Sequence, residues 1–405
     1  MSDWDKLAND YPEYRLLAQK FREPRPRRLL ALDGGGIRGV LTLEVLAELE
    51  RQLREKTGGG PDFRLSDYFD YVAGTSTGAI IAAGLALGFP VQKLLDFYQK
   101  SGKAMFKKPW LWKRLWYSYE SKPLLRTLKR TFSVDGQDTT LGSGNLRCLL
   151  LVVLRNVTTD SPWPLSSNPF ATYNRLERKD SNLRVPLYKL VRASTAAPVF
   201  FSPQTISFEE GNAKKTFKFE DGGMTPYNNP AFLLYRMATE EPYKLSWEKG
   251  EKKLLLVSVG TGAAPLLDAR IYSQGNSILK NAANIPSALM YGAQIDQDVN
   301  CRLSGRCVYG APIDREIGDL IPLDRSSTLD SPPHLPLSVD LGRNFLYARY
   351  NVELTHEGLA DLGITGVDPE KVAKLDSVKS MKDLRRIGKA LGEKTVDVTR
   401  FGPHV

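Results

Sequence analysis

Cysteine is scarce in this sequence. Its 405 residues include three cysteines, Cys148, Cys301 and Cys307, and no paired CxxC motif. Three such cysteines form no even disulfide framework, which indicates a reducing compartment and argues against a zinc site. We therefore expect a cytoplasmic protein without a metal centre.

Long apolar runs are also absent. No window holds about 18 uninterrupted apolar residues, so we expect no transmembrane helix. The first stretch, MSDWDKLANDYPEYRLL, is acidic and amphipathic. It lacks the basic start and the apolar middle of a secretion signal. We therefore expect neither a membrane-spanning nor a secreted protein.

The composition permits a sizeable folded core. Hydrophobic residues make up 42% and charged residues 25% of the chain, an ordinary globular balance. The length suits one large domain or two medium ones. We expect a helical arm and charged linker at 1–26, a main domain at 27–330, and a C-terminal extension at 331–405 that packs on it.

Apolar patterning predicts strands that alternate with helices. Buried strands are expected at 27–33, 68–74, 148–154 and 253–260. Helices are expected from residue 40 to the glycines at 58–60, at 77–88, at about 280–300 and at about 378–392. This alternation indicates an α/β fold, with a largely parallel central sheet covered by helices on both faces.

The segment GTSTG, residues 74–78, fits Gly-x-Ser-x-Gly between an expected strand and an expected helix. That context is typical of a nucleophile elbow, a sharp turn that exposes a serine. Ser76 would then lie at a helix start, where free N–H groups and the helix dipole favour a developing negative charge. Gly74 and Gly78 would permit the tight turn. The alternative is an ordinary turn in which Ser76 caps the helix.

The segment DGGGIRG, residues 33–39, places three glycines between another strand and helix. Gly34, Gly36 and Gly39 also match the dinucleotide motif Gly-x-Gly-x-x-Gly, but a loop occupies the window about 20 residues on where that motif needs an acid. The Gly-Lys-Ser/Thr of a phosphate loop is absent. Consecutive backbone N–H groups beside a serine elbow suit an oxyanion, and Arg38 adds a cation. Dinucleotide binding stays as the weaker alternative.

A serine nucleophile needs a base. The three histidines, His334, His356 and His404, all come late in the chain, and we expect each at the surface. The other candidate is Asp221, in FEDGGMTPYNNP at 219–230. Its alternative is an ordinary Asp-Gly turn.

Four motifs, taken together, favour Asp221 as the base over an ordinary turn. DGGGIRG, GTSTG, ASTAAPVFFSP at 193–203, and DGG followed by NNP occur in this order. Together they closely resemble the patatin-like phospholipases, over about residues 27–265. The resemblance implies a three-layer fold, a catalytic domain at 27–330, lipid acyl hydrolase activity without a cofactor, and a Ser–Asp dyad of Ser76 and Asp221. It also implies an oxyanion hole formed by Gly34, Gly35, Gly36 and Arg38.

A basic, tryptophan-rich segment stands apart from these motifs. Residues 100–130 carry ten Lys or Arg and one acid. Interleaved tryptophans and cations suit an anionic membrane surface. The alternatives are an amphipathic helix with buried tryptophans and, less favoured, single-strand binding; we expect no nucleic-acid partner. The residues of this predicted docking surface are Lys107, Lys108, Trp110, Trp112, Lys113, Arg114 and Trp116.

These features predict a peripheral membrane enzyme that cleaves fatty acyl esters of glycerophospholipids through an acyl-serine intermediate. Asp221 would have to be desolvated to act as a base, because an ordinary aspartate is a weak one. Rival readings are an effector of bacterial antiviral defence gated by a cyclic nucleotide, and a peptidase or small-ester hydrolase with the same dyad. The sequence leaves a small-molecule activator and oligomer formation open.

Overall fold

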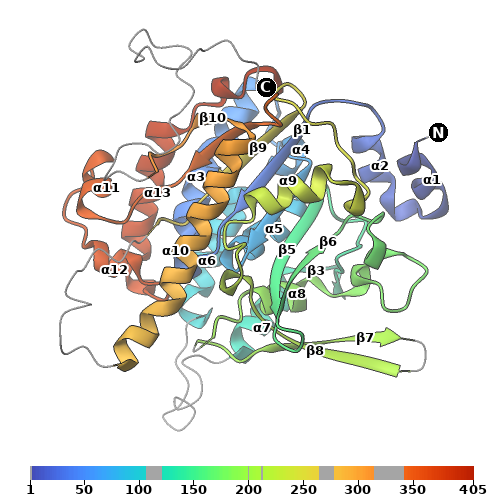
Figure 1. The fold of residues 1–405 in the computed structure, drawn as a ribbon, viewed down its shortest axis with the longest axis horizontal. Coiled ribbons are helices and arrows are strands. Elements are labelled where there is room, and N and C mark those ends of the chain that lie inside the picture. The colour runs from blue at the N-terminus through green and yellow to red at the C-terminus, as the bar shows by residue number, and fades with distance from the viewer. Residues whose placement is uncertain (1, 106–120, 199, 211–212, 264–277, 314–341) are drawn as a thin grey trace.

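Nine strands of the part of the chain that the structure describes form a mixed sheet at the centre of the protein (Figure 1). The computed structural model describes residues 2–105, 121–198, 200–210, 213–263, 278–313 and 342–405. The strand order is β10-β11-β9-β1-β2-β5-β8-β7, and β6 also pairs with β5. The strands are β1 (Arg27–Leu32), β2 (Tyr71–Thr75), β5 (Leu149–Asn156), β6 (Ser161–Ser166), β7 (Gln204–Glu210), β8 (Ala213–Asp221), β9 (Leu254–Val259), β10 (Arg306–Tyr309) and β11 (Leu346–Tyr350). β3 (Ser133–Val134) and β4 (Gln137–Asp138) form a separate ribbon.

The strands from β10 to β5 run parallel, whereas β6, β7 and β8 join antiparallel. The helices are α1 (Asp3–Asp10), α2 (Arg15–Phe21), α3 (Gly39–Lys56), α4 (Leu65–Tyr68), α5 (Thr77–Ala86), α6 (Val91–Met105), α7 (Ser121–Thr131), α8 (Leu187–Ser194), α9 (Ala231–Thr239), α10 (Ile278–Ser304), α11 (His356–Asp361), α12 (Pro369–Ala373) and α13 (Met381–Thr395). Within the described ranges, no helix combines the length and apolar character needed to cross a bilayer.

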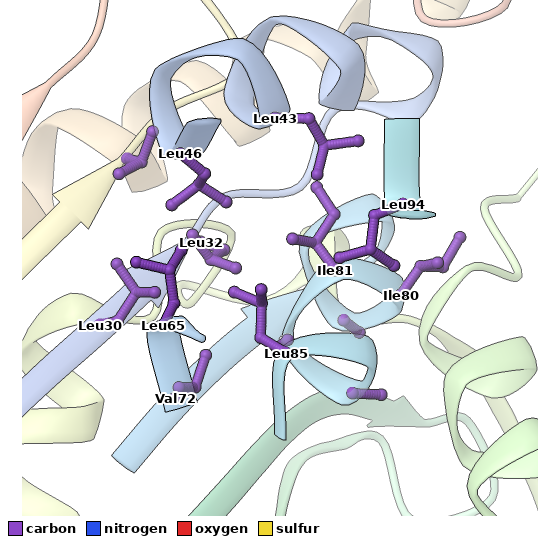
Figure 2. Packing of buried hydrophobic residues seen from close by; sticks show 14 of the residues in the cluster. Leu30, Leu32, Leu43, Leu46, Leu65, Val72, Ile80, Ile81, Leu85 and Leu94 are labelled. Carbon is purple, nitrogen blue, oxygen red and sulfur yellow. The ribbon is translucent and has the colours of Figure 1, made fainter. Parts of the chain in front are cut away.

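Helices cover both faces of the sheet, which gives three layers. Leu30 and Leu32 of β1 face a core shared with α3, α5, α6, α7, α8 and α13. Leu29 and Ala31, which alternate with them, face a second core shared with α1, α2, α9 and the end of α10. Because successive side chains of a strand point to opposite faces, the apolar residues at the end of β1 bury both of its faces. Figure 2 shows part of the first core between β1, β2, α3 and α5. The predicted α/β class and two-sided cover are confirmed.

The parallel strands were the easier part of the sheet to predict. The four expected strands correspond to β1, β2, β5 and β9, and the helix expected at 77–88 is α5. The hairpin β7–β8 and the strands β6, β10 and β11 were not predicted. β7 and β8 alternate apolar and polar residues, as in "TISF" and "KTFKF", which is the signature of a half-exposed antiparallel pair.

The C-terminal part of the chain contributes to the sheet itself. β11 is an inner strand between β9 and β10, and α13 packs along α3. The boundary expected at residue 330 lies outside the described residues, and the division of the chain there stays a prediction. The structure nevertheless makes residues beyond it part of the central layer.

Candidate active site

Ser76 occupies a strained turn between β2 and α5. Its backbone has φ 53° and ψ −121°, a conformation that costs a non-glycine residue free energy and that concentrates at functional sites. A Cβ on Gly74 would lie 2.1 Å from the Gly78 carbonyl oxygen, and one on Gly78 would lie 2.3 Å from the Leu32 carbonyl oxygen. Only glycine fits at both positions, so the local sequence forces β1, β2 and α5 into the close contact that a nucleophile elbow requires.

The hydroxyl of Ser76 is directed at Asp221 rather than at the helix it precedes. Ser76 Oγ donates to Asp221 Oδ2 at 2.6 Å, and the two side chains are buried. Asp221 is the last residue of β8 and lies opposite Leu154 of β5. The Gly223 N–H donates to Asp221 Oδ1 at 2.8 Å, so both carboxylate oxygens have a partner. The two residues named from sequence as nucleophile and base are therefore in direct contact.

Burial makes Asp221 a stronger base than an ordinary aspartate. Removal from water raises the pKa of Asp221 from 3.8 to about 7, because a buried carboxylate loses its hydration. The hydrogen bonds from Ser76 and Gly223 and the positive charge of Arg192 oppose this rise and keep the pKa from moving further. A base with a pKa near the working pH suits proton transfer from a hydroxyl.

The glycine loop lies beside the nucleophile. A Cβ on Gly34 would approach the Ser76 Cβ to 3.2 Å, and Gly36 lines the same cavity as Ser76 and Asp221. The Gly34 N–H donates to the Asn228 carbonyl at 3.0 Å, so this amide is already engaged. Among the described residues, no acceptor is recorded for the N–H groups of Gly35 and Gly36. Of the backbone N–H groups predicted to form the oxyanion hole, those of Gly35 and Gly36 therefore remain as candidate donors.

Arg38, predicted as part of the oxyanion hole, contacts the glycine loop itself, and its role in the hole stays a prediction. It is buried, and its Nε donates to the Gly35 carbonyl at 3.4 Å. Burial lowers the pKa of Arg38 to about 10. Gly36 lines the cavity at Ser76, whereas Arg38 is not among the residues that line it. The contact of its Nε ties Arg38 to the loop that carries the amides.

A narrow apolar cavity of about 60 Å³ leads to the dyad. Its walls combine α5, α7, α10, the loop after α8, the turn after Asp221 and a C-terminal segment. Hydrocarbon side chains dominate the walls, which suits a hydrocarbon ligand. The lining residues include Ile80, Leu124, Phe200, Phe201, Met224, Met290 and Leu375.

Two site residues escaped prediction. Ser194, inside the ASTAAPVFFSP motif, accepts from the Ser76 N–H at 2.9 Å and donates to the Val153 carbonyl at 2.7 Å. It thus ties the elbow to β5. Leu375 lies in a C-terminal loop, and its carbonyl accepts from the Ile37 N–H at 2.8 Å. The motif could have indicated Ser194, but no local pattern indicates Leu375.

The histidines lie away from the dyad where the structure describes them. His356 begins α11 and is exposed, as expected. The expectation for His404 was wrong: its side chain is fully buried, with Nε2 2.8 Å from the Glu251 carbonyl. A hydrogen bond to a main-chain carbonyl lets the ring sit inside the protein. His334 and the predicted docking surface, residues 107–116, lie outside the described residues.

Comparison with known proteins shows the family of the chain. The profile of the family described as Patatin-like phospholipase matches residues 30–235. The chain belongs to the patatin-like phospholipase family. This patatin-like chain is 31% identical to a cGAMP-activated phospholipase of Vibrio cholerae serotype O1, over 62% of its length and 66% of the relative's. It is also 31% identical to Patatin-like protein 1 of Arabidopsis thaliana, over 58% of each chain.

A second cGAMP-activated phospholipase, from Escherichia coli, is 30% identical over 58% of this chain and 63% of the relative. The matches thus span 58 to 66% of these three relatives' own lengths. Among solved structures, human GIVD cytosolic phospholipase A2 matches with a TM-score of 0.39 and 13% identity, over 97% of this chain and 61% of that one. A score this low adds nothing to the assignment.

Proposed function

We propose that the protein is a lipid acyl hydrolase of phospholipase A type that cleaves fatty acyl esters of glycerophospholipids. The observation that carries the proposal is the 2.6 Å contact between Ser76 Oγ and Asp221 Oδ2 at a strained elbow. The apolar cavity and the family membership support a lipid substrate.

The first half of the reaction forms an ester on the serine. Asp221 takes the hydroxyl proton of Ser76 as Oγ attacks the acyl carbonyl carbon. The carbonyl oxygen becomes an oxyanion, which we expect the N–H groups of Gly35 and Gly36 to bind. The intermediate then collapses. The bond to the lysolipid oxygen breaks, that oxygen takes the proton from Asp221, and the acyl group stays on Ser76.

The second half releases the fatty acid. Asp221 is again a carboxylate and accepts a proton from water as the water oxygen attacks the acyl-serine carbonyl. The same two amides bind the second oxyanion. Its collapse breaks the bond to Ser76 Oγ, which recovers its proton from Asp221. No group beyond the dyad, the loop amides and water enters these steps.

Lipid product analysis tests the proposal. Purified protein is incubated with glycerophospholipid liposomes, and the products are measured by mass spectrometry. We expect free fatty acid and lysolipid from the wild type and none above background from Ser76→Ala or Asp221→Asn. Ser207→Ala, an exposed serine of β7, is the matched control and should stay active. Full activity of Ser76→Ala, or cleavage of peptides but not lipids, would contradict the proposal.

Activation by a cyclic nucleotide is a second candidate, because two relatives at 31% and 30% identity are named cGAMP-activated phospholipases. The same liposome assay with and without cGAMP tests it. Activation predicts that fatty acid release rises sharply on addition of cGAMP. An equal rate in its absence would rule out gating by this ligand and leave the hydrolase proposal standing.

Membrane docking by the basic segment remains a sequence-based proposal. The dyad must reach an ester at a lipid surface, and α7, which follows the segment, supplies Leu124 to the cavity. Charge reversal at Lys107, Lys108, Lys113 and Arg114 is expected to abolish flotation with anionic liposomes and to spare hydrolysis of a soluble ester. Unchanged flotation would refute docking, and lost binding to single-stranded nucleic acid would support the alternative.

A further inference from the structure

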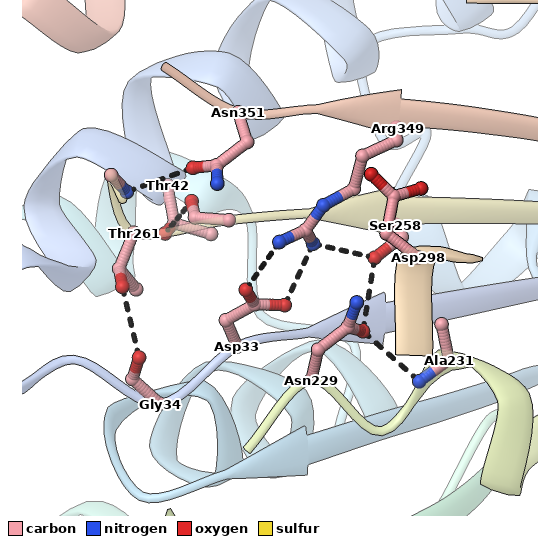
Figure 3. Close-up of polar contacts among 12 residues, drawn as sticks. Asp33, Gly34, Thr42, Asn229, Ala231, Ser258, Thr261, Asp298, Arg349 and Asn351 are labelled. Atoms are coloured by element: carbon pink, nitrogen blue, oxygen red, sulfur yellow. Dashed lines mark hydrogen bonds and ion pairs between the residues drawn. The ribbon is translucent and has the colours of Figure 1, made fainter. Parts of the chain in front are cut away.

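A buried ion pair anchors the first residue of the glycine loop. Asp33, which opens DGGGIRG, is fully buried, and Arg349 of β11 is 3% exposed. Arg349 Nη1 donates to Asp33 Oδ1 at 2.8 Å, and Nη2 donates to Oδ2 at 2.6 Å. Such a two-pronged contact fixes direction as well as distance. Figure 3 shows the guanidinium facing the carboxylate where the loop begins.

The arginine is itself held in place. Its Nη1 also donates to Ser258 Oγ of β9 at 2.7 Å, and Ser258 Oγ donates to Asn229 Oδ1 at 3.2 Å. Asn229 belongs to the NNP segment, where the preceding Asn228 carbonyl accepts from the glycine loop. The network therefore links β11, β9, the NNP segment and the glycine loop to one another (Figure 3).

Further contacts confine the loop on two other sides. Thr261 Oγ1 donates to the Gly34 carbonyl at 2.9 Å. A Cβ on Gly35 would lie 2.1 Å from Thr261 Oγ1, so this side chain also presses against the loop. The Leu375 carbonyl binds the next amide, that of Ile37. Gly35 and Gly36, the two candidate oxyanion donors, thus lie between two anchored residues. Arg349 anchors Asp33 before them, and the Leu375 carbonyl anchors Ile37 after them.

We propose that Arg349 is a positioning residue that sets the direction of the Gly35 and Gly36 amides through Asp33. The proposal rests on the proposed hydrolase function and extends it to a strand beyond the family match, which ends at residue 235. A buried ion pair is a weak source of stability because desolvation offsets its attraction. Its geometric effect is larger, since oxyanion donors act only within a narrow range of distance.

The test compares Arg349→Lys with Arg25→Lys. Lysine keeps the charge and loses the two-pronged geometry. Arg25 Nη1 and Nη2 both donate to the carboxylate of Asp70, the residue just before β2. Arg25→Lys is therefore the matched control. Five quantities are measured for each protein: kcat and KM on a soluble acyl ester, the affinity for a fatty acyl trifluoromethyl ketone, the affinity for an uncleavable ether lipid, and the melting temperature.

The trifluoromethyl ketone separates positioning from folding, because Ser76 converts it to an oxyanion whereas the ether lipid forms none. We expect Arg349→Lys to lower kcat and the ketone affinity by about 100-fold each, the effect of misplacing a catalytic group by about 1 Å. KM and the ether-lipid affinity should stay unchanged. Arg25→Lys should match the wild type in all four catalytic and binding quantities.

Asp33→Asn/Arg349→Gln guards against a variant that fails to fold, because it removes both charges and leaves none buried alone. It should show the same selective loss. Wild-type kcat in Arg349→Lys, or a parallel loss of ketone and ether-lipid affinity, would overturn the positioning role. A wild type that cleaves no acyl ester would instead overturn the proposed function on which this role rests.

Discussion

Replacing Asp221 by Asn should stabilise the protein above pH 7 while it abolishes turnover. Asp221 is 5% exposed, and burial raises its pKa from 3.8 to about 7. Holding this carboxylate ionised inside the fold therefore costs stability. At about 1.4 kcal/mol per pKa unit, the cost reaches about 4 kcal/mol at most. Asparagine has the same shape and no charge: its oxygen can accept from the Gly223 N–H, and its NH2 group can donate to Ser76 Oγ in place of the bond that Asp221 accepts.

The sign of the pH dependence follows from proton binding. Between about pH 4 and 7 the folded protein keeps the Asp221 proton because its pKa is raised, while the unfolded chain has lost it. The folded state binds more protons, so the wild-type free energy of unfolding falls as pH rises through this window. The variant lacks the group. Its advantage over the wild type should grow by about 1.4 kcal/mol per pH unit and level off above pH 7.

Urea unfolding of both proteins at half-unit steps from pH 4.5 to 8.5 measures the difference, and turnover of a soluble acyl ester is followed in parallel. Wild-type kcat/KM should fall about tenfold per pH unit below pH 7, because the base becomes protonated. A difference in unfolding free energy that does not vary with pH would refute the reasoning. So would wild-type activity that is flat from pH 5 to 8.

Three further changes probe the parts around the dyad. Gly36→Ala places a side chain on a residue with φ 59°, and its Cβ would lie 2.2 Å from the Leu375 carbonyl oxygen. It should lose about 1–3 kcal/mol of stability in urea unfolding and most turnover, whereas exposed Gly60→Ala, with nothing within 4 Å, should change neither. Ser194→Ala leaves the N–H of the nucleophile without its acceptor, and should lower kcat and cost about 1–3 kcal/mol; wild-type values for both would contradict its role. His404→Gln should lower the melting temperature and keep kcat. A folded variant without turnover would contradict the claim that the base is Asp221 and not a histidine.

The nucleophile elbow was predictable because its signals are local, whereas Asp221 was named as its base only through the resemblance carried by four motifs together. GTSTG carries its strand, its turn and its helix within a few residues, and the two glycines record contacts that admit no side chain. DGG at the end of β8 is equally short. The elbow's strain, with φ 53° at Ser76, follows from the same few residues.

The support of the glycine loop was not predictable, because its partners are distant in the sequence. Arg349 pairs with a residue 316 positions earlier, and its charge interrupts the apolar run LYARY that would otherwise indicate a buried strand. Burial of His404 likewise depends on a carbonyl 153 positions away. Such pairs arise from the tertiary fold, and one sequence holds no periodic trace of them.

The role of Arg38 shows the limit of a motif. DGGGIRG places a cation beside three glycines, and sequence alone favours an oxyanion contact. In the structure Arg38 Nε donates to the Gly35 carbonyl, because a buried guanidinium needs acceptors and the loop supplies one. The motif thus indicates which residues share the loop, whereas the contact that each one makes depends on backbone geometry.

Covalent capture tests the central claim most directly. The protein is incubated with a fluorophosphonate that carries a fatty chain, digested, and the modified peptide is identified by mass spectrometry. We expect one adduct, on Ser76, that forms at least about 100-fold more slowly in Asp221→Asn, in line with the usual contribution of a base. An adduct on another residue, or labelling of Ser76 at an equal rate without the carboxylate, would contradict the central claim.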